Sequence, residues 1–109
     1  MAKFVIELGK GGYRFNLLAG NNEPILHSET YTNKAGAKRG IASVQKHAGD
    51  DKNYQRKTAK NGAPYFNLRA RNNKVIGTSE MYSGTSAMEN GVKAVKEAAK
   101  KASVEDRSK

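Results

Sequence analysis

Two hydrophobic periods alternate along the chain, and each change of period predicts a change from strand to helix. Phe4, Ile6 and Leu8 are separated by single residues, which is the spacing of a strand with one buried face. The alternation resumes over residues 13–19 after a glycine-rich turn. A second turn, rich in Gly and Asn, leads to residues 24–29. The first part of the chain therefore predicts three consecutive strands.

After Tyr31 the apolar residues recur every three or four positions, which is the period of an amphipathic helix. The first stripe predicts a helix over about residues 34–48, and an equivalent stripe recurs near the C-terminus. The two stripes are Ala37, Ile41, Val44 and Ala48, and Met88, Val92, Val95 and Ala99. Ser86 followed by Glu89 has the spacing of a capping box, so we expect the second helix to be the better formed.

The chain repeats itself at an offset of 51 residues. Residues 13–48 align with 64–99 without a gap and share 13 identities in 36 positions, whereas ordinary composition gives roughly two or three. The identical pairs are Phe15/Phe66, Asn16/Asn67, Leu17/Leu68, Ala19/Ala70, Asn21/Asn72, Asn22/Asn73, Ile25/Ile76, Ser28/Ser79, Glu29/Glu80, Tyr31/Tyr82, Gly40/Gly91, Val44/Val95 and Ala48/Ala99. A repeat of this length indicates one supersecondary unit used twice.

The segment near residues 52–60 belongs to both repeats. Its first part matches residues after the second helix, and its later part matches the first strand, so one strand is expected to close repeat one and open repeat two. Each unit then reads β-β-β-α-β, with repeat one about 1–53 and repeat two about 54–109. Because each half is near the size at which a core becomes marginal, we expect one domain over 1–109. Its expected core is Phe4, Ile6, Phe15, Leu17, Ile25, Ile41, Val44, Phe66, Leu68, Ile76, Val92 and Val95.

The repeated motifs resemble those of the YegP-like family over about residues 4–99. They are FNLLAGNN and FNLRARNN at 15–22 and 66–73, SETY and SEMY at 28–31 and 79–82, and YQRKTAKNG at 54–62. The resemblance implies an α+β fold of two tandem β-β-β-α-β repeats in one shared antiparallel sheet, with exchanged closing strands and both helices on one face. It also implies a monomer with internal pseudo-two-fold symmetry. The family is of uncharacterised function, so the resemblance implies no catalytic or binding residues.

The composition limits the classes of partner more strongly than it limits the kinds of activity. Twenty Lys and Arg against ten Asp and Glu give a net charge of +10, which favours encounter with nucleic acid or acidic protein. The absence of cysteine excludes a disulfide, a thiolate metal site and a cysteine nucleophile, and it suits a reducing cytoplasm. No signal peptide or apolar membrane span is recognisable, so we expect a soluble cytoplasmic protein with no membrane partner.

One group of polar residues is a candidate for polyanion binding. Alternation places it on the sheet face opposite the core, where arginine can pair with phosphate and an aromatic ring can stack on a base. Its members are Arg14, Asn16, Tyr65, Asn67, Arg69 and Arg71. The alternative is a plain solvated face, because the open side of an antiparallel sheet is normally polar.

Other repeated motifs have a structural and a functional interpretation. The Ser-Glu-x-Tyr segments at 28–31 and 79–82 offer a base and a proton donor, yet they also suit a strand end that satisfies backbone groups. Gly40 and Gly91 predict either close helix packing or a ligand cleft. His27 and His47 lie in different elements, with no Cys and no acidic cluster at ligand spacing, so no metal site is expected. No catalytic residue and no cofactor are expected either.

Three classes of function remain open from the sequence. A small non-catalytic interaction or accessory module is favoured, because no catalytic constellation is present. Weak nucleic-acid or polyanion binding through the exposed basic sheet face is the alternative. An enzyme built on the Ser-Glu-x-Tyr segments is the least favoured.

Overall fold

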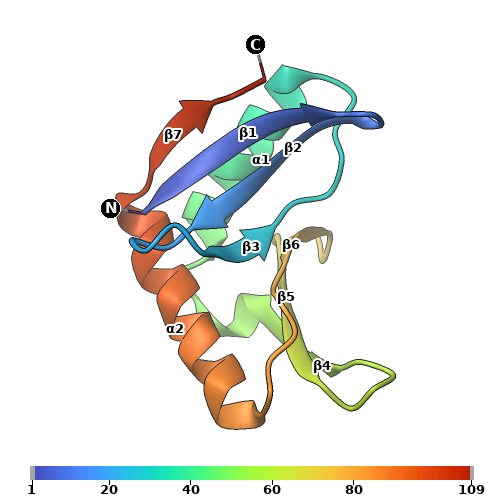
Figure 1. The fold of residues 1–109 in the computed structure, drawn as a ribbon, viewed down its shortest axis with the longest axis vertical. Helices are drawn as coiled ribbons and strands as arrows, with labels where there is room; N and C mark the ends of the chain where they lie inside the picture. The colour runs from blue at the N-terminus through green and yellow to red at the C-terminus, as the bar shows by residue number, and fades with distance from the viewer. Residues whose placement is uncertain (1, 109) are drawn as a thin grey trace.

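The computed structural model describes residues 2–108, which form two α-helices, one 3-10 turn and seven strands (Figure 1). The elements in chain order are β1 (Lys3–Gly9), β2 (Gly12–Leu18), β3 (Pro24–His27), α1 (Lys34–His47), the 3-10 turn η1 (Asp51–Asn53), β4 (Tyr54–Thr58), β5 (Pro64–Arg69), β6 (Val75–Thr78), α2 (Thr85–Lys101) and β7 (Ser103–Asp106). The three-strand and helix order predicted for each repeat is confirmed.

All seven strands form one sheet in the order β4-β5-β6-β3-β2-β1-β7. The repeats meet at β3 and β6, which pair antiparallel at His27 and Thr78. Leu26 and Gly77 also lie at this junction, and they are equivalent by the 51-residue offset. A Cβ atom on Gly77 would come within 2.6 Å of the Leu26 Cδ2 atom. Only one of the two equivalent positions can therefore carry a large side chain.

The closing strand is exchanged on one side of the sheet. β7, from repeat two, pairs with β1 of repeat one, and this pair is parallel, so the sheet is mixed and not wholly antiparallel. β7 reaches β1 by way of α2 and not by a hairpin turn. A connection through a helix allows parallel pairing, whereas a tight hairpin joins antiparallel strands. The residues equivalent to β7 in repeat one run directly into β4, partly as η1. Because they are covalently continuous with β4, they cannot pair alongside it.

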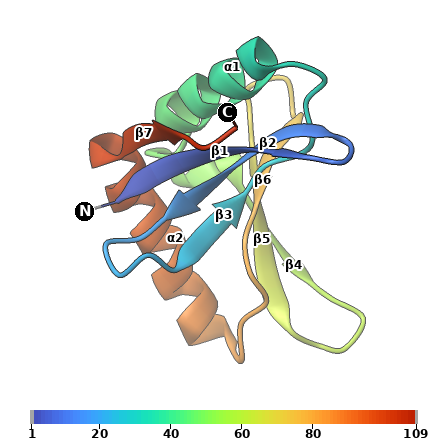
Figure 2. The same ribbon diagram turned by 45° about the horizontal axis from the view of Figure 1, so that its top comes forward.

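Both helices cover the same face of the sheet, as expected (Figure 2). The hydrophobic core lies between the helices and the sheet, and each of its side chains is 5% exposed or less. It comprises Phe4, Ile6, Phe15, Leu17, Leu26, Ala37, Ile41, Val44, Ala48, Tyr54, Phe66, Leu68, Ile76, Met88, Val92, Val95 and Ala99. Ile25, expected in the core, is only partly buried. The β2–β3 register shifts between Leu17 and Leu18, and Leu26 is the β3 residue that fills the core.

The helix caps differ from the expectation. Asn33 caps α1, because its side chain accepts a hydrogen bond from the Gly36 N–H at 2.7 Å. α2 begins after Gly84 and has no side-chain cap. The capping box expected from Ser86 does not form, because Ser86 lies inside the helix and Glu89 binds Arg56 instead. The first helix is therefore the better capped one.

The repeated mid-helix glycines make room for the repeated tyrosines. A Cβ atom on Gly40 would overlap the Tyr31 hydroxyl, and one on Gly91 would overlap the Tyr82 hydroxyl. Each tyrosine ring also stacks on a core phenylalanine, with ring centroids 6.2 and 6.4 Å apart. The close-packing interpretation of these glycines agrees with these contacts.

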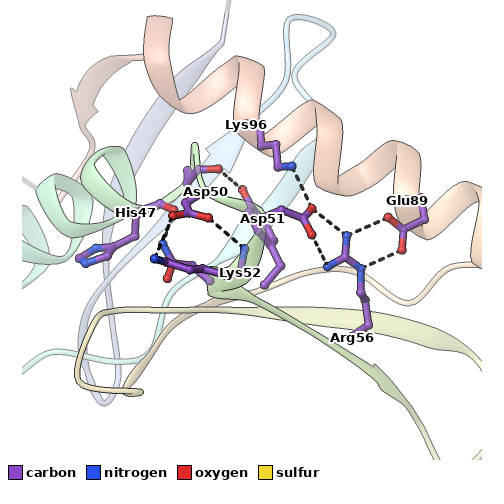
Figure 3. A network of polar contacts seen from close by, with 10 residues as sticks. His47, Asp50, Asp51, Lys52, Arg56, Glu89 and Lys96 are labelled. Atoms are coloured by element: carbon purple, nitrogen blue, oxygen red, sulfur yellow. Dashed lines mark hydrogen bonds and ion pairs between the residues drawn. The ribbon is translucent and has the colours of Figure 1, made fainter.

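β4 is the end strand of the sheet, and an ion-pair network joins it to η1 and α2 (Figure 3). Arg56 occupies the β4 position that Ile6 occupies in β1, since each pairs with the equivalent phenylalanine of the next strand. Its guanidinium binds Asp51 at 3.0 Å and Glu89 at 2.8 Å. Lys96 binds the same Asp51 carboxylate at 2.9 Å. On β4, charged groups thus take the place that a buried apolar side chain takes on β1.

Candidate anion-binding site

The turn after β5 fixes the positions of two arginines. Arg69 ends β5, and Arg71 follows in the turn to β6. The Ala70 N–H donates to the Lys74 carbonyl at 2.9 Å, and the Asn73 N–H donates to the Ala70 carbonyl at 2.9 Å. Asn73 has a left-handed φ of 67°, which asparagine tolerates better than most residues. The backbone closes this turn, so neither arginine side chain is needed for that purpose.

His47 holds the end of α1 against the same turn. Its Nδ1 lies 2.8 Å from the Ser43 carbonyl, so Nδ1 carries the proton and donates. Its Nε2 accepts a hydrogen bond from the Arg71 backbone N–H at 3.2 Å. This pair of partners assigns the neutral imidazole. Because α1 belongs to repeat one and the turn to repeat two, His47 joins the two repeats.

The segment after α1 satisfies the carbonyl groups at the helix end. The Asn53 Nδ2 donates to the His47 carbonyl at 2.9 Å, and the Tyr54 hydroxyl donates to the Ala48 carbonyl at 2.7 Å. Burial raises the pKa of Tyr54, which keeps its hydroxyl protonated as a donor. These bonds occupy carbonyls that would otherwise present the negative end of the helix dipole.

These three segments surround a recess of about 430 Å³, hereafter the basic recess. It is lined by Lys46, His47, Asp50, Lys52, Asn53, Arg69, Ala70, Arg71 and Asn73. Four of these side chains are cationic and one is anionic. Among residues 2–108, Lys52 forms an ion pair with Asp50 at 3.6 Å, whereas Lys46, Arg69 and Arg71 form no ion pair. The fold therefore leaves most of this positive charge without an opposite charge.

One buried donor of the basic recess lacks an acceptor. The Nε atom of Arg69 is buried and has no hydrogen-bond partner within the described residues. A buried donor without an acceptor costs about 1–3 kcal/mol, and more for a charged group. Native structures leave few such groups, so each calls for a physical explanation. Because this atom has less than 1 Å² of accessible surface, a bound anion would reach it only after the Arg69 side chain moves.

A second recess, of about 310 Å³, lies at the equivalent place between the end of α2 and the β2–β3 turn. It is lined by Ala2, Ala19, Gly20, Ala94, Glu97, Ala98 and Lys101, and is hereafter the alanine recess. The 51-residue offset relates its Ala98 to His47 and its Gly20 to Arg71. Its turn repeats the geometry of the first: the Ala19 N–H donates to the Glu23 carbonyl at 2.9 Å, and Asn22 has a φ of 66°. The fold thus builds the same recess with and without the cluster of cations.

The structure separates the six candidate residues of the open sheet face. Arg69 and Arg71 line the basic recess, and Tyr65 lies at the other end of β5, half-buried. Asn67 is 9% exposed and accepts a hydrogen bond from the Thr78 hydroxyl at 3.0 Å. It therefore offers less to a ligand than the alternation suggests.

The remaining two candidates lie on β2. Arg14 is exposed, and its guanidinium lies beside Gly9. Asn16 is tied to His27, whose Nδ1 lies 2.8 Å from the Asn16 Oδ1. The other ring nitrogen of His27 lies 3.0 Å from a Glu80 carboxylate oxygen. This chain of contacts crosses from repeat one to repeat two beside the β3–β6 junction.

The Ser-Glu-x-Tyr segments have structural partners. The Ser28 hydroxyl accepts a hydrogen bond from the Phe15 N–H at 2.8 Å, and the Ser79 hydroxyl accepts one from the Phe66 N–H at 3.0 Å. His27 contacts the Asn16 amide and the Glu80 carboxylate, and within residues 2–108 no hydroxyl group is among its hydrogen-bond partners. Within residues 2–108 no group of three or more His, Cys, Asp or Glu side chains is placed to hold a metal ion.

Sequence reasoning missed most of the basic recess. It identified Arg69 and Arg71 but not the lysines, His47 or the asparagines contributed by α1, η1 and the β5–β6 turn. A signal was nevertheless present, because at the 51-residue offset Arg71 corresponds to a glycine and His47 to an alanine. The two repeats share a backbone fold but differ in charge at these positions. That difference in charge is the sequence signal for the candidate site.

Comparison with known proteins gives the family. A model described as a domain of unknown function, DUF1508, matches the chain twice, over residues 10–55 and 59–106. A UPF0339 protein from Bordetella pertussis is 54% identical over 105 residues, which cover 96% of this chain and 95% of that protein. The UPF0339 protein YegP from Shigella flexneri is 48% identical over 84 residues, covering 77% and 76%. The chain belongs to the DUF1508 family, as a protein with two repeats, and its relatives are uncharacterised UPF0339 proteins.

Solved structures of relatives share the fold. The solution NMR structure of YegP from Escherichia coli has a TM-score of 0.93 and 41% identity, covering 98% of this chain and 93% of that chain. The solution NMR structure of a UPF0339 protein from Shewanella oneidensis has a TM-score of 0.92 and 44% identity, covering 98% and 92%. The first is described as a protein of unknown function. No helix within residues 2–108 has both the length and the apolar character needed to cross a membrane.

Proposed function

We propose that this protein is a monomeric, cytoplasmic, non-catalytic interaction module that binds the phosphate backbone of nucleic acid. Arg69 and Arg71 are the principal contacts, and the other cations of the basic recess assist them. Tyr65 and Arg14 extend the contact over the open sheet face, where a ring can stack on a base. Asn16 and Asn67 belong to the same face but act mainly through their internal hydrogen bonds.

The difference between the two recesses carries this proposal. The turn and the helix end form in both, so the cations of the basic recess are not required by the fold. Clustered arginine and lysine side chains repel one another, and this repulsion destabilises the folded state. Among the described residues, no ion pair of Lys46, Arg69 or Arg71 offsets it in the basic recess. A phosphate ligand would supply the negative charge that the recess lacks. The net charge of +10 would also speed the encounter with a polyanion.

The non-catalytic assignment rests on how the candidate catalytic groups are used. The repeated serines satisfy backbone N–H groups, and the repeated tyrosines fill the space above the helix glycines. These roles leave the Ser-Glu-x-Tyr segments as parts of the fold. The basic recess contains cations, amides and one carboxylate, which suit binding more than bond cleavage.

The test is a salt series with labelled single- and double-stranded oligonucleotides, followed by fluorescence anisotropy. The Arg69→Ala/Arg71→Ala variant should weaken binding and lower the slope of log K against log salt. The decrease should be about 0.7 per lost contact with single strands and about 0.9 with duplex. Lys100→Ala/Lys101→Ala is the matched control, since it removes the same charge beside the alanine recess.

Three results decide the proposal. A lower slope in the arginine variant alone supports it. Equal losses in both variants would reduce the effect to net charge and contradict a role for the basic recess. Lack of binding at low salt, or equal competition by polyglutamate, would show that nucleic acid is not the partner.

A further inference from the structure

We infer that the basic recess takes the dianionic phosphate at the end of a nucleic-acid strand in preference to a phosphodiester within it. This inference rests on the proposed function for its choice of ligand. It adds that a phosphomonoester is the group bound, which the general attraction between a basic protein and a polyanion does not require.

The charge of the recess suits a dianion. Lys46, Lys52, Arg69 and Arg71 contribute four positive charges, and Asp50 contributes one negative charge. A phosphomonoester carries about −1.5 to −2 charges at pH 7, whereas a phosphodiester carries about −1. Coulomb attraction scales with the product of the charges, so the terminal phosphate gains nearly twice as much from the same cations.

The donors converge from separate segments of the chain. Lys46 comes from the last turn of α1, Lys52 from η1, and the two arginines from the end of β5 and the turn after it. A group held between them has donors on several sides, as a phosphate with three terminal oxygens can use. The guanidinium groups of Arg69 and Arg71, which both line the recess, have the planar fork that matches two oxygens of one phosphate.

The walls of the recess are held in place before any ligand arrives. His47 accepts the Arg71 backbone N–H and so fixes the turn against α1. Asn53 binds the His47 carbonyl and fixes the start of β4 against the same helix end. Such bonds reduce the ordering cost of binding. The volume of about 430 Å³ lies within the range of small-molecule sites, so it accommodates a terminal nucleotide as well as its phosphate.

The experiment compares one oligonucleotide sequence with a 5′-phosphate, a 3′-phosphate or hydroxyl groups at both ends, binding to the full chain. At least one phosphorylated form should bind about tenfold more tightly than the hydroxyl form, which is about 1.4 kcal/mol. Inorganic phosphate should remove that advantage by competition. The advantage should disappear in Arg69→Ala/Arg71→Ala and persist in Lys100→Ala/Lys101→Ala.

The outcomes separate this inference from the proposed function. Equal binding of all three oligonucleotides, weakened equally by Arg69→Ala/Arg71→Ala, would overturn the inference and leave nucleic-acid binding intact. Binding of inorganic phosphate without binding of any oligonucleotide would keep the phosphate assignment and overturn nucleic acid as its source. No binding of phosphate or oligonucleotide would overturn both.

Discussion

The basic recess and the alanine recess occupy equivalent places in the two halves of the fold, yet their side chains differ. Each is formed by a helix end from one repeat and a turn from the other. The turns share a backbone hydrogen-bond pattern and a left-handed asparagine, Asn22 in one and Asn73 in the other. The residues that line them differ. His47 of the basic recess is equivalent to Ala98 of the alanine recess, and Arg71 is equivalent to Gly20.

In a duplicated sequence, identical and divergent positions carry different information. Positions that are identical in both repeats serve the turns, the core and the helix packing, as the Tyr31–Gly40 and Tyr82–Gly91 contacts illustrate. Some positions that differ also serve the fold, as Leu26 and Asn33 do, but the charged residues of the basic recess lie among the positions that differ. Identity between the repeats therefore reports the shared fold, and divergence in charge indicates the candidate site.

The largest expected effect comes from separating the repeats, because each recess needs both of them. A chain ending at Asn53 would lose β4–β7 and α2, including the β7 strand that covers β1. We expect it to dimerise or to fail to fold, since the two halves share one core. Analytical ultracentrifugation with circular dichroism would measure this. A stable compact monomer would contradict the shared-sheet account.

Next in size is the loss of a contact that both repeats share. Gly40→Ala and Gly91→Ala should each destabilise the protein by about 1–3 kcal/mol through overpacking against a tyrosine. Better helix propensity would offset about 1 kcal/mol of that loss. Urea denaturation measures the free energy of unfolding, and Gly49→Ala is the control because nothing lies within 4 Å of its Cβ position. A loss in one repeat only would break the equivalence of the repeats.

A smaller effect is expected from making the alanine recess basic. Gly20→Arg/Glu97→Lys places cations where Arg71 and Lys46 stand in the other recess. The equivalent turn already carries an arginine, so the backbone should tolerate the change. Isothermal titration calorimetry with a phosphorylated oligonucleotide should then show a second, weaker binding event. Unchanged stoichiometry would mean that the recess shape and these two charges are insufficient for binding.

The smallest expected effect concerns the Arg56 network, which joins β4 to η1 and α2 and has no counterpart at Ile6 in repeat one. Hydrogen bonds from Arg56 and Lys96 lower the pKa of Asp51 to about 2, and Arg56 lowers the pKa of Glu89. Both carboxyl groups have lower pKa values when folded, so their contribution is complete above their usual values of 3.8 and 4.5. It is lost as the pH falls toward 2.

Arg56→Ala should therefore destabilise the protein slightly near neutral pH, and less as the solution is acidified. The effect is small because the pairs are largely exposed. Thermal unfolding between pH 7 and pH 3 would show it, with Lys57→Ala as a control for the loss of one charge on the same strand. A pH-independent difference between the wild type and Arg56→Ala would rule out the network as its cause.

Periodicity predicted the elements well because one buried face determines both strand and helix patterns. It did not predict that Asn33 caps α1 while α2 has no side-chain cap, since capping depends on the geometry of a single turn. It also placed Ile25 in the core, which the register shift in the β2–β3 pair gives to Leu26. The parallel β1–β7 pair depends on the path of α2 across the sheet, which no local pattern contains.

The candidate site was harder to predict than the fold. Strand alternation identified Arg69 and Arg71, but the lysines and His47 come from a helix end and η1 that pack there only in three dimensions. Alternation also included Asn67, which the structure buries against Thr78. Local patterns describe one element at a time, whereas this recess is made where two repeats meet.

The central claim is that the basic recess binds phosphate and the alanine recess does not. An NMR titration of the labelled full chain with a phosphorylated oligonucleotide tests it within one molecule. We expect the backbone amide signals of Ala70, Arg71 and Asn73 to shift in a saturable manner, while those of Ala19, Gly20 and Asn22 keep their chemical shifts. Equal shifts in the two turns, or shifts spread evenly over the basic surface, would contradict it.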